Sequence, residues 1–355
     1  MDYDLLTREA TDLLCRLIET PRLSREETAA ANLLEQWLKE RNMQPERRGN
    51  NLIVRHAGKA DAPVLLLNAH IDTVRPMASW TRNPYQATLE GDVLYGLGSN
   101  DDGASLVTMI QAFRLLCQED LNYNLVLALS AEEEVSGKNG MESLVPLLGR
   151  VDVALVGEPT GMQPALCEKG LMVLDCTAKG CPGHAARDEG DNAIYHALDD
   201  MQWFRTHRWE RVSPLLGPVK MTVTIVNAGT QHNVVPAECQ FTVDVRTNEL
   251  YTNEELFRLI RQEVRSEVRA RSFRLGSSRL DENHPLAQAA IRMGRTPYGS
   301  PTLSDQALMP WPSMKMGPGD SRRSHSADEY IRVSELREAI EMYHQLLSAL
   351  PTVRG

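Results

Sequence analysis

The chain of 355 residues is poor in cysteine and aromatic side chains and lacks long apolar runs. Its six cysteines form no CxxC pair, which favours a reduced compartment over a disulfide scaffold. No apolar stretch approaches the roughly 18 residues that span a bilayer. The first residues show no basic-then-apolar leader. We therefore expect a cytoplasmic protein with no membrane partner.

Positive charge is also scarce, because 38 Lys and Arg stand against 48 Asp and Glu, a formal net charge of −10. An acidic chain repels phosphate backbones, and no basic stripe with interleaved aromatic residues is present. We therefore expect no nucleic-acid partner. The length predicts one large domain with a smaller one, and the 42% hydrophobic content is that of a globular protein.

Short apolar strands alternate with helices in the first part of the chain. The pattern predicts an N-terminal helix that Pro21 interrupts, strands at 51–55, 64–68, 124–130 and 152–156, and helices at 104–118 and 141–148. Ser24 and Glu27 predict a capping box for a second helix. This alternation favours an α/β fold with a mostly parallel, helix-covered sheet.

The pattern changes near Glu168. Strands at 171–178, 220–227 and 238–246, with helices at 193–208 and 254–269, predict a separate α+β domain of the ferredoxin-like type with an antiparallel sheet. The earlier pattern resumes near His284, and a last helix is predicted from 333 to 350. We therefore expect a discontinuous domain of residues 1–167 and 279–355, with residues 168–278 inserted into it.

Histidine and acidic residues follow several of the predicted strands. They are His70 and Asp72 in HID, Asp101 at the end of the glycine turn GLGSND, the glutamates 132–134, Glu158, and His325 near the C-terminus. Strand ends that carry such residues place charge along one edge of a sheet. Because like charges so close together need a cation between them, the pattern predicts a metal site there.

Each piece alone has a plainer explanation. A histidine at a strand end is often structural, Asp101 could simply cap the next helix, and an acidic triplet could be a solvated helix start. The turn is not a dinucleotide-binding fingerprint, because Asp101 stands where the third glycine belongs. Cys181 and His184 have a metal-like spacing, but without a second thiolate pair we favour a substrate-facing loop. The joint occurrence favours the metal site.

The sequence resembles the M20 family of metallopeptidases and deacylases, most closely its acetylornithine deacetylase branch. The family's motifs occur in order over nearly the whole chain: HID at 70–72, GLGSND at 96–101, SAEEEVSG at 130–137, VGEPTG at 156–161, GCPGH at 180–184, HNVVP at 232–236, VDVR at 243–246, GPGD at 317–320 and SHSADEY at 324–330. The resemblance implies a metal-binding catalytic domain and a smaller domain that forms a homodimer and acts as a lid.

The resemblance also implies two Zn²⁺ ions per subunit. Asp101 would bridge them, His70 and Glu158 would hold one, and Glu134 and His325 the other. The same ligand set also accepts Co²⁺ or Mn²⁺. Three carboxylates against two divalent ions leave a single positive charge.

Further roles follow from the same resemblance. Asp72 would orient His70, and Glu133 would be the general base for the attacking water. His184 would stabilise the oxyanion in the partner subunit's site. Asn233 and Arg246 would contact substrate, with Arg246 suited to an α-carboxylate.

The chain departs from the family at three positions that are not ligands. Leu97 stands where the family usually has Arg, Gly103 follows Asp102 directly where Lys-Gly is usual, and Glu132 replaces Asp. The acidic triplet therefore has a second register, in which Glu132 and Glu133 take the roles of base and ligand. We favour Glu133 and Glu134, because SAEEEVSG aligns through Val135 and Gly137.

The implied function is a metal-dependent amide hydrolase of arginine biosynthesis that removes an acetyl or succinyl group from an Nα-acyl amino acid such as acyl-ornithine or acyl-citrulline. The alternatives are a succinyl-diaminopimelate desuccinylase, a dipeptidase or carboxypeptidase of the same family, and a non-catalytic binding relative. Arg322 and Arg323 lie beside His325. We hypothesise that one of them, Arg323 in our assignment, recognises the second carboxylate of a succinyl group; the alternative is a surface pair.

Overall fold

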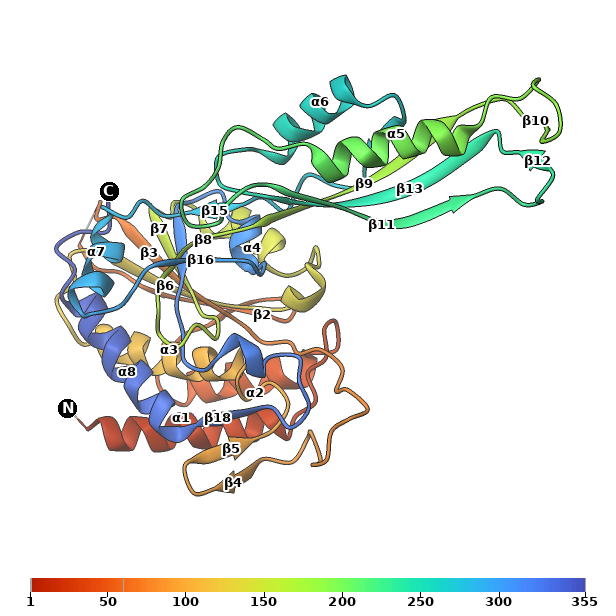
Figure 1. Cartoon of the computed structure of the whole chain (residues 1–355). Helices are drawn as coiled ribbons and strands as arrows, with labels where there is room; N and C mark the ends of the chain where they lie inside the picture. Colours follow the sequence, from red (N-terminus) through yellow and green to blue (C-terminus); the bar gives the residue numbers. More distant parts are fainter. Residues whose placement is uncertain (1, 60, 355) are drawn as a thin grey trace. The chain divides into compact units, whose positions relative to one another are not determined.

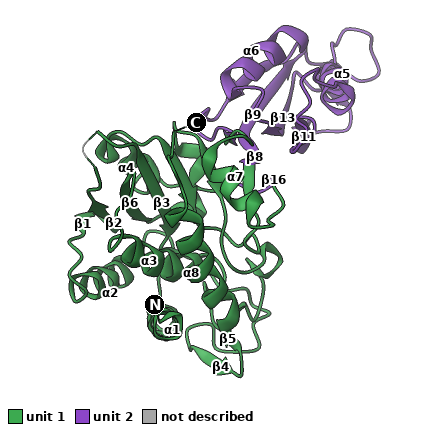
Figure 2. Cartoon of the chain, turned by 90° about the vertical axis from the view of Figure 1, so that its left-hand side faces the viewer, with its two compact units in different colours: residues 1–166, 279–298, 304–355 green, residues 167–278, 299–303 purple. Residues whose placement is uncertain are grey.

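The computed structural model describes residues 2–59 and 61–354, and these divide into two compact units (Figure 2). Unit 1 comprises Met1–Leu166, Arg279–Tyr298 and Ser304–Gly355, and unit 2 comprises Cys167–Ser278 and Gly299–Leu303. Unit 2 is thus inserted into unit 1 along the chain. In the described part of the chain, no helix is both long and apolar enough to cross a membrane.

Unit 1 is built on a mixed sheet with the strand order β1-β2-β6-β3-β7-β17-β8-β15, in which β16 also pairs with β8. The strands are β1 (Glu46–Arg48), β2 (Asn51–His56), β3 (Val64–His70), β6 (Asn124–Ser130), β7 (Val153–Val156), β8 (Ala165–Glu168), β15 (Ser278–Arg279), β16 (Tyr298–Ser300) and β17 (Ser313–Lys315). β6, β3, β7 and β17 are parallel neighbours, and their carboxyl ends therefore share one edge. The chain passes between the units within β8, β15 and β16, and once more between Leu303 and Ser304.

Helices cover both faces of this sheet (Figure 1). α1 (Tyr3–Ile18), α3 (Gly103–Leu116) and α8 (Val333–Ser348) pack against one another and form the main core with one face, and α4 (Met141–Leu148) covers the other. The remaining helices of unit 1 are α2 (Thr28–Lys39), α7 (Pro285–Arg292) and the short 3-10 segments η1 (Glu133–Val135), η2 (Asp305–Leu308) and η3 (Ser321–Arg323). A small sheet has the order β18-β5-β4 (Tyr330–Arg332, Val93–Tyr95 and Thr88–Glu90).

Unit 2 is an antiparallel sheet with the order β11-β13-β9-β14, flanked by two helices. Its elements are β9 (Gly170–Lys179), β10 (Gly183–His184), α5 (Ala193–Thr206), β11 (Lys220–Ala228), β12 (Val234–Val235), β13 (Glu238–Thr247), α6 (Asn253–Glu263) and β14 (Glu267–Ala270). Side chains alternate between buried and partly exposed along β9, which is the pattern of a sheet covered on one face. The predicted α/β fold with an inserted α+β unit is confirmed.

Two local predictions were wrong. Ser24 and Glu27 do not form a capping box, because the Ser24 hydroxyl donates to Asp72 at 2.7 Å and Glu27 accepts from the backbone N–H groups of Arg25 and Glu132. The helix predicted over 254–269 ends at Glu263. Asp200 accepts hydrogen bonds from the N–H groups of Arg265 and Ser266, and the chain then continues as β14 along β9.

Candidate metal centre

The centre lies at the carboxyl ends of the parallel strands of unit 1. His70 is the last residue of β3, the glutamates 132–134 follow β6, and Glu158 follows β7 by two residues. Asp101 comes from the turn between β5 and α3, and His325 from the loop after η3. The fold therefore delivers these side chains from five separate segments to one edge of the sheet.

Four of the predicted ligands lie together. Ligand atoms of His70, Asp101 and Glu134 all lie within 4.8 Å of one another. His325 Nε2 is 2.9 Å from Glu134 Oε2 and 3.8 Å from Asp101 Oδ2, while His70 Nε2 is 3.2 Å from Asp101 Oδ1. The two carboxylate oxygens of Asp101 thus face two different histidines, as a ligand shared between two ions would.

Glu158 belongs electrostatically to the same group, although it lies outside the tight cluster. Burial raises the pKa of its carboxyl well above the usual range, the charge of the buried Lys315 opposes this, and the neighbouring Asp101 and Asp102 add to it. A carboxyl that resists ionisation among other acids is stabilised by a divalent cation.

His70 is fully enclosed and is held through both ring nitrogens. Its Nδ1 is 3.0 Å from the Asp72 carbonyl oxygen and 3.5 Å from the Asp72 carboxylate. Burial alone would lower the pKa of His70, but the hydrogen bonds to Asp101 and Asp72 outweigh it and raise the pKa well above 6.5. Asp72 therefore fixes the ring and directs Nε2 toward the cluster.

The Asp72 carboxylate also organises the acidic triplet. It accepts hydrogen bonds from the backbone N–H groups of Glu133 at 3.0 Å and Glu134 at 3.2 Å. Glu132 has a left-handed backbone, with φ of 56°, and its carboxylate accepts hydrogen bonds from Asn139. Glu132 is thereby engaged elsewhere, whereas Glu134 enters the ligand cluster. This geometry favours the register with Glu133 as base and Glu134 as ligand.

Glu133 is surrounded by other acids. Burial raises the pKa of its carboxyl well above the usual range; the charge of His70 opposes this, and Glu158, Asp305 and Glu134 add to it. Asp305, at the start of η2, accepts a hydrogen bond from Ser130 and has a pKa of about 6, raised by burial. A carboxyl with a raised pKa beside a cation-binding cluster is suited to proton transfer.

Glu329 is a part of the centre that sequence reasoning missed. Its carboxylate is buried and accepts hydrogen bonds from the backbone N–H groups of Gly98, Asn100 and Asp101 at 2.8, 2.9 and 2.8 Å. It therefore fixes the turn that presents Asp101. The only sequence signal was its place in the SHSADEY motif, four residues after His325.

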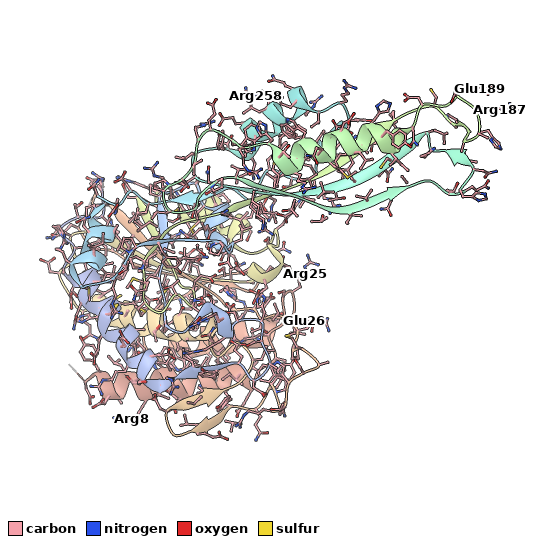
Figure 3. The ribbon with its side chains drawn as sticks, in the orientation of Figure 1. Arg8, Arg25, Glu26, Arg187, Glu189 and Arg258 are labelled. Carbon is pink, nitrogen blue, oxygen red and sulfur yellow. The ribbon has the colours of Figure 1, made fainter. Side chains whose placement is uncertain are left out.

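The remaining predicted residues divide between the units. Within unit 2, His184 and Asn233 are exposed on neighbouring segments, joined by the hydrogen bond from Ala185 N–H to the Asn233 carbonyl at 3.0 Å. Arg246, on β13, forms a two-pronged pair with Asp244. Figure 3 shows Arg187 and Glu189 at the tip of the loop that follows His184.

Arg323 lies in unit 1 and is already paired. Its guanidinium is 2.7 Å from Glu335 and lies over the Tyr330 ring, while the more exposed Arg322 pairs with Asp320. A pocket of about 260 Å³ adjoins His325 instead. It is lined by Val74, Arg75, Pro76, Met77, Trp80, Leu97, His325 and Ser326. The pocket is mostly apolar, and Arg75, whose guanidinium lies 3.7 Å from the Glu26 carboxylate, is the arginine among its lining residues.

The donor set fits divalent metal ions. Imidazole nitrogens and carboxylate oxygens are the ligands that Zn²⁺ takes in catalytic sites, and Co²⁺ and Mn²⁺ accept the same donors. Without a cation the cluster concentrates several acids in a space that opposes their ionisation. The pKa of Asp102, beside Asp101, is about 7, raised by burial and by the Asp101 charge.

Comparison with known proteins supports the family that the sequence resembles. Residues 66–349 match the profile of Peptidase family M20/M25/M40. The chain is 27% identical to acetylornithine deacetylase of Proteus mirabilis, over 95% of each chain, and 24% identical to succinyl-diaminopimelate desuccinylase of Cereibacter sphaeroides, over 94% of this chain and 97% of the relative. Its fold matches a dinuclear metal-binding peptidase of family M20 from Bacillus subtilis with a TM-score of 0.74 and 18% identity, over 99% of this chain and 100% of the other.

Proposed function

The chain belongs to Peptidase family M20/M25/M40 and is a metal-dependent amide hydrolase, and we propose that it uses two Zn²⁺ ions to remove an acyl group from an Nα-acyl amino acid. The observation that carries the proposal is Asp101, whose two carboxylate oxygens face His70 and His325 separately. In this arrangement Asp101 would be shared by both ions, His70 and Glu158 would hold one, and Glu134 and His325 would hold the other.

When bound, the ions polarise the scissile carbonyl and make water acidic enough to attack near neutral pH. Glu133 accepts the proton of the attacking water and then passes it to the departing amine. Its backbone N–H is held by Asp72, so the base and the ligand Glu134 are fixed by one carboxylate.

The oxyanion donor in this proposal is His184. Its Nδ1 accepts a hydrogen bond from the Ala186 N–H at 3.1 Å, which leaves the proton of a neutral ring on Nε2. An exposed Nε2–H is available to a developing oxyanion. Arg246 and Asn233 bind the substrate's amino-acid part, and the planar fork of Arg246 suits an α-carboxylate.

We also propose a homodimer formed through unit 2. β11 is an edge strand that exposes Ile225 and Val226, and the neighbouring α5 exposes Tyr195 and Leu198. An apolar edge strand is a template for pairing with another chain. A second copy of the same strand would cover this edge symmetrically.

The amine product in this proposal is ornithine or citrulline, as in arginine biosynthesis in the cytoplasm, and the acyl group is acetyl or succinyl. The relatives named for succinyl-diaminopimelate desuccinylase favour that substrate as the second candidate. The pocket beside His325 suits a short acyl chain, and Arg75 or the predicted Arg323 would pair with the terminal carboxylate of a succinyl group.

A substrate screen combined with single variants tests the catalytic proposal. Purified enzyme with Zn²⁺ is assayed on acetyl and succinyl derivatives of ornithine, citrulline, lysine and diaminopimelate. Glu133→Gln should lower kcat about 10²- to 10⁴-fold while metal content is retained. Glu132→Gln is the matched control, because its carboxylate is bound by Asn139; if this variant loses activity instead, the register of the triplet is shifted by one.

Acyl specificity is tested by the ratio of kcat/KM for succinyl and acetyl substrates. Loss of succinyl preference in Arg323→Ala supports the residue predicted from the sequence, and loss in Arg75→Ala supports the pocket residue. If both variants keep the wild-type ratio, no succinyl carboxylate is recognised at either position.

Mixed dimers test whether His184 acts in the partner's site. His184→Ala and Glu133→Ala are each inactive alone in this proposal. After subunit exchange, a mixed dimer contains one site with an intact base and an intact partner histidine, so random mixing should restore about one quarter of wild-type activity. If His184 serves its own subunit, mixing restores nothing. Sedimentation of Ile225→Lys, which should be monomeric, tests the edge itself.

A further inference from the structure

A buried arginine lies beside the metal centre and has no place in the roles assigned so far. Arg22, in the segment between α1 and α2, is only 1% exposed. Its guanidinium donates one hydrogen bond to the Ile71 carbonyl and another to the Gly98 carbonyl, the latter at 2.8 Å. Burial of a cation is costly, and such a group is retained where its partners compensate it.

The two acceptors belong to the two segments that carry the first ligands. Ile71 lies between His70 and Asp72, and Gly98 lies in the turn that presents Asp101. The backbone of Arg22 is fixed to the first segment as well, because its carbonyl accepts from the Thr73 N–H at 2.9 Å. One guanidinium thus joins the His70 segment to the Asp101 turn.

Two side chains of opposite charge bind the backbone of Gly98 in this turn. The Gly98 carbonyl accepts from Arg22, while the Gly98 N–H donates to Glu329 at 2.8 Å. The turn leaves little room for anything else: a Cβ atom at Gly98 would lie 2.5 Å from Arg22 Nη2, and one at Gly103 would lie 3.0 Å from it. Glycine at both positions leaves the space that the guanidinium fills.

The guanidinium also supplies positive charge beside three segments of the centre that contain no basic residue of their own. Residues 68–73, 96–105 and 130–137 contain no Lys or Arg. Four carboxylates attract the charged guanidinium of Arg22: those of Glu329, Asp72, Asp102 and Asp101. Because an arginine side chain stays protonated in proteins, this positive charge is permanent.

We propose that Arg22 is a positioning residue of the metal centre, which fixes the distance between the His70 segment and the Asp101 turn and offsets the charge of the carboxylates around them. The proposal rests on the metal site proposed above. It assigns Arg22 no contact with substrate or metal. It predicts that Arg22 sets the affinity of the site for metal in protein that is otherwise folded.

The test compares Arg22→Met with Arg55→Met. Arg55 is the matched control, because its guanidinium also donates to two backbone carbonyls, those of Leu147 and Leu148, which lie in α4 and outside the metal centre. Metal-free protein is titrated with Zn²⁺ against a chromophoric chelator, and with Co²⁺ while its visible absorption spectrum is recorded. Far-UV circular dichroism verifies that each variant is folded.

We expect Arg22→Met to bind Zn²⁺ about 10- to 100-fold more weakly than wild type and to change the Co²⁺ spectrum. Arg55→Met should keep both at wild-type values. Folded Arg22→Met with wild-type affinity and an unchanged spectrum overturns the proposal, since the arginine would then serve stability alone. Wild-type protein that binds neither metal would refute the metal site itself, which is a separate result.

If Arg22→Met does not fold, the Arg22→Lys variant tests the positioning role of Arg22. A lysine keeps the charge, but its compact ammonium lacks the fork that reaches both carbonyls. We expect its Zn²⁺ affinity to lie between those of wild type and Arg22→Met, or several-fold below wild type where the methionine variant cannot be measured. Wild-type affinity and an unchanged Co²⁺ spectrum in Arg22→Lys would contradict the positioning role.

Discussion

The substitution Asp72→Asn separates the two tasks of one buried carboxylate. Asp72 is fully buried, and its two oxygens serve different partners. Oδ1 accepts from the Glu133 N–H at 3.0 Å, while Oδ2 accepts from the Glu134 N–H at 3.2 Å and the Ser24 hydroxyl at 2.7 Å. An asparagine has the same shape but offers only one oxygen.

The cost follows from this arrangement. Whichever way the amide is turned, its NH₂ group faces a backbone N–H group and cannot accept a hydrogen bond from it. One buried donor without a partner costs about 1–3 kcal/mol, and the surviving hydrogen bonds lose the benefit of a charged acceptor. We therefore expect the free energy of unfolding of the metal-free protein to fall by about 2–4 kcal/mol. Because His70 also loses its charged neighbour, Zn²⁺ affinity should fall about 10- to 100-fold.

Urea unfolding measures the free energy of unfolding, and a chelator is present because bound metal would add its own stabilisation. Competition with a chromophoric chelator measures the Zn²⁺ affinity. Asp175→Asn is the control: Asp175 forms an exposed pair with Arg271 on unit 2, and such pairs contribute about 0–1 kcal/mol. A stability of Asp72→Asn within about 0.5 kcal/mol of wild type would refute the hydrogen-bond argument.

Three further predictions concern protons, a turn and unit 2. Hydrogen bonding to Glu134 raises the pKa of His325 to about 9, so Zn²⁺ binding at pH 7 should release its proton, and calorimetry should give heats that depend on the ionisation enthalpy of the buffer. In metal-free protein the pairing of His325 with Glu134 stabilises the fold fully below about pH 6.5, and this stabilisation is lost as the pH rises through 9. The free energy of unfolding of a His325→Gln variant should lack this pH dependence, and a variant that keeps the wild-type dependence contradicts the prediction. Gly98→Ala should destabilise far more than Gly49→Ala in urea unfolding: both have positive φ, but a Cβ at Gly98 would lie 2.4 Å from Thr73 Cγ2, whereas at Gly49 nothing lies within 4 Å. Asp200→Ala removes the acceptor for Arg265 and Ser266 and should make unit 2 more sensitive to proteolysis, with Zn²⁺ affinity unchanged.

Much of the fold could be predicted because its signals are local. The apolar run of β6 and the periodicity of α4 gave their observed bounds, Asn124–Ser130 and Met141–Leu148. The place of the metal site could be predicted for a related reason, whereas the roles of the individual ligands came from the family resemblance. Parallel strands end at one edge, so a residue type that recurs after successive strands is brought together by the topology.

The errors arose where a distant side chain decides the local structure. The Ser24 hydroxyl could cap a helix, but it binds Asp72, which is far along the sequence. Helical periodicity continued past Glu263, but Asp200 holds the N–H groups of Arg265 and Ser266 outside the helix. Arg22 gave no signal, because a single arginine after a proline looks like any exposed loop residue until its acceptors are known.

The long-range hydrogen bonds of Asp72 and Glu329 are of the same kind, and they help to explain why so many acids surround the centre. Asp72 accepts the N–H groups of Glu133 and Glu134, and Glu329 accepts those of the Asp101 turn. Each of these two carboxylates therefore accepts hydrogen bonds from the backbone of a segment that carries a proposed ligand. The acids divide into those that hold ligand loops and those that face the cluster. It follows that neutralising a loop-holding acid should weaken metal binding through the position of a neighbour, whereas neutralising Glu134 removes a donor outright.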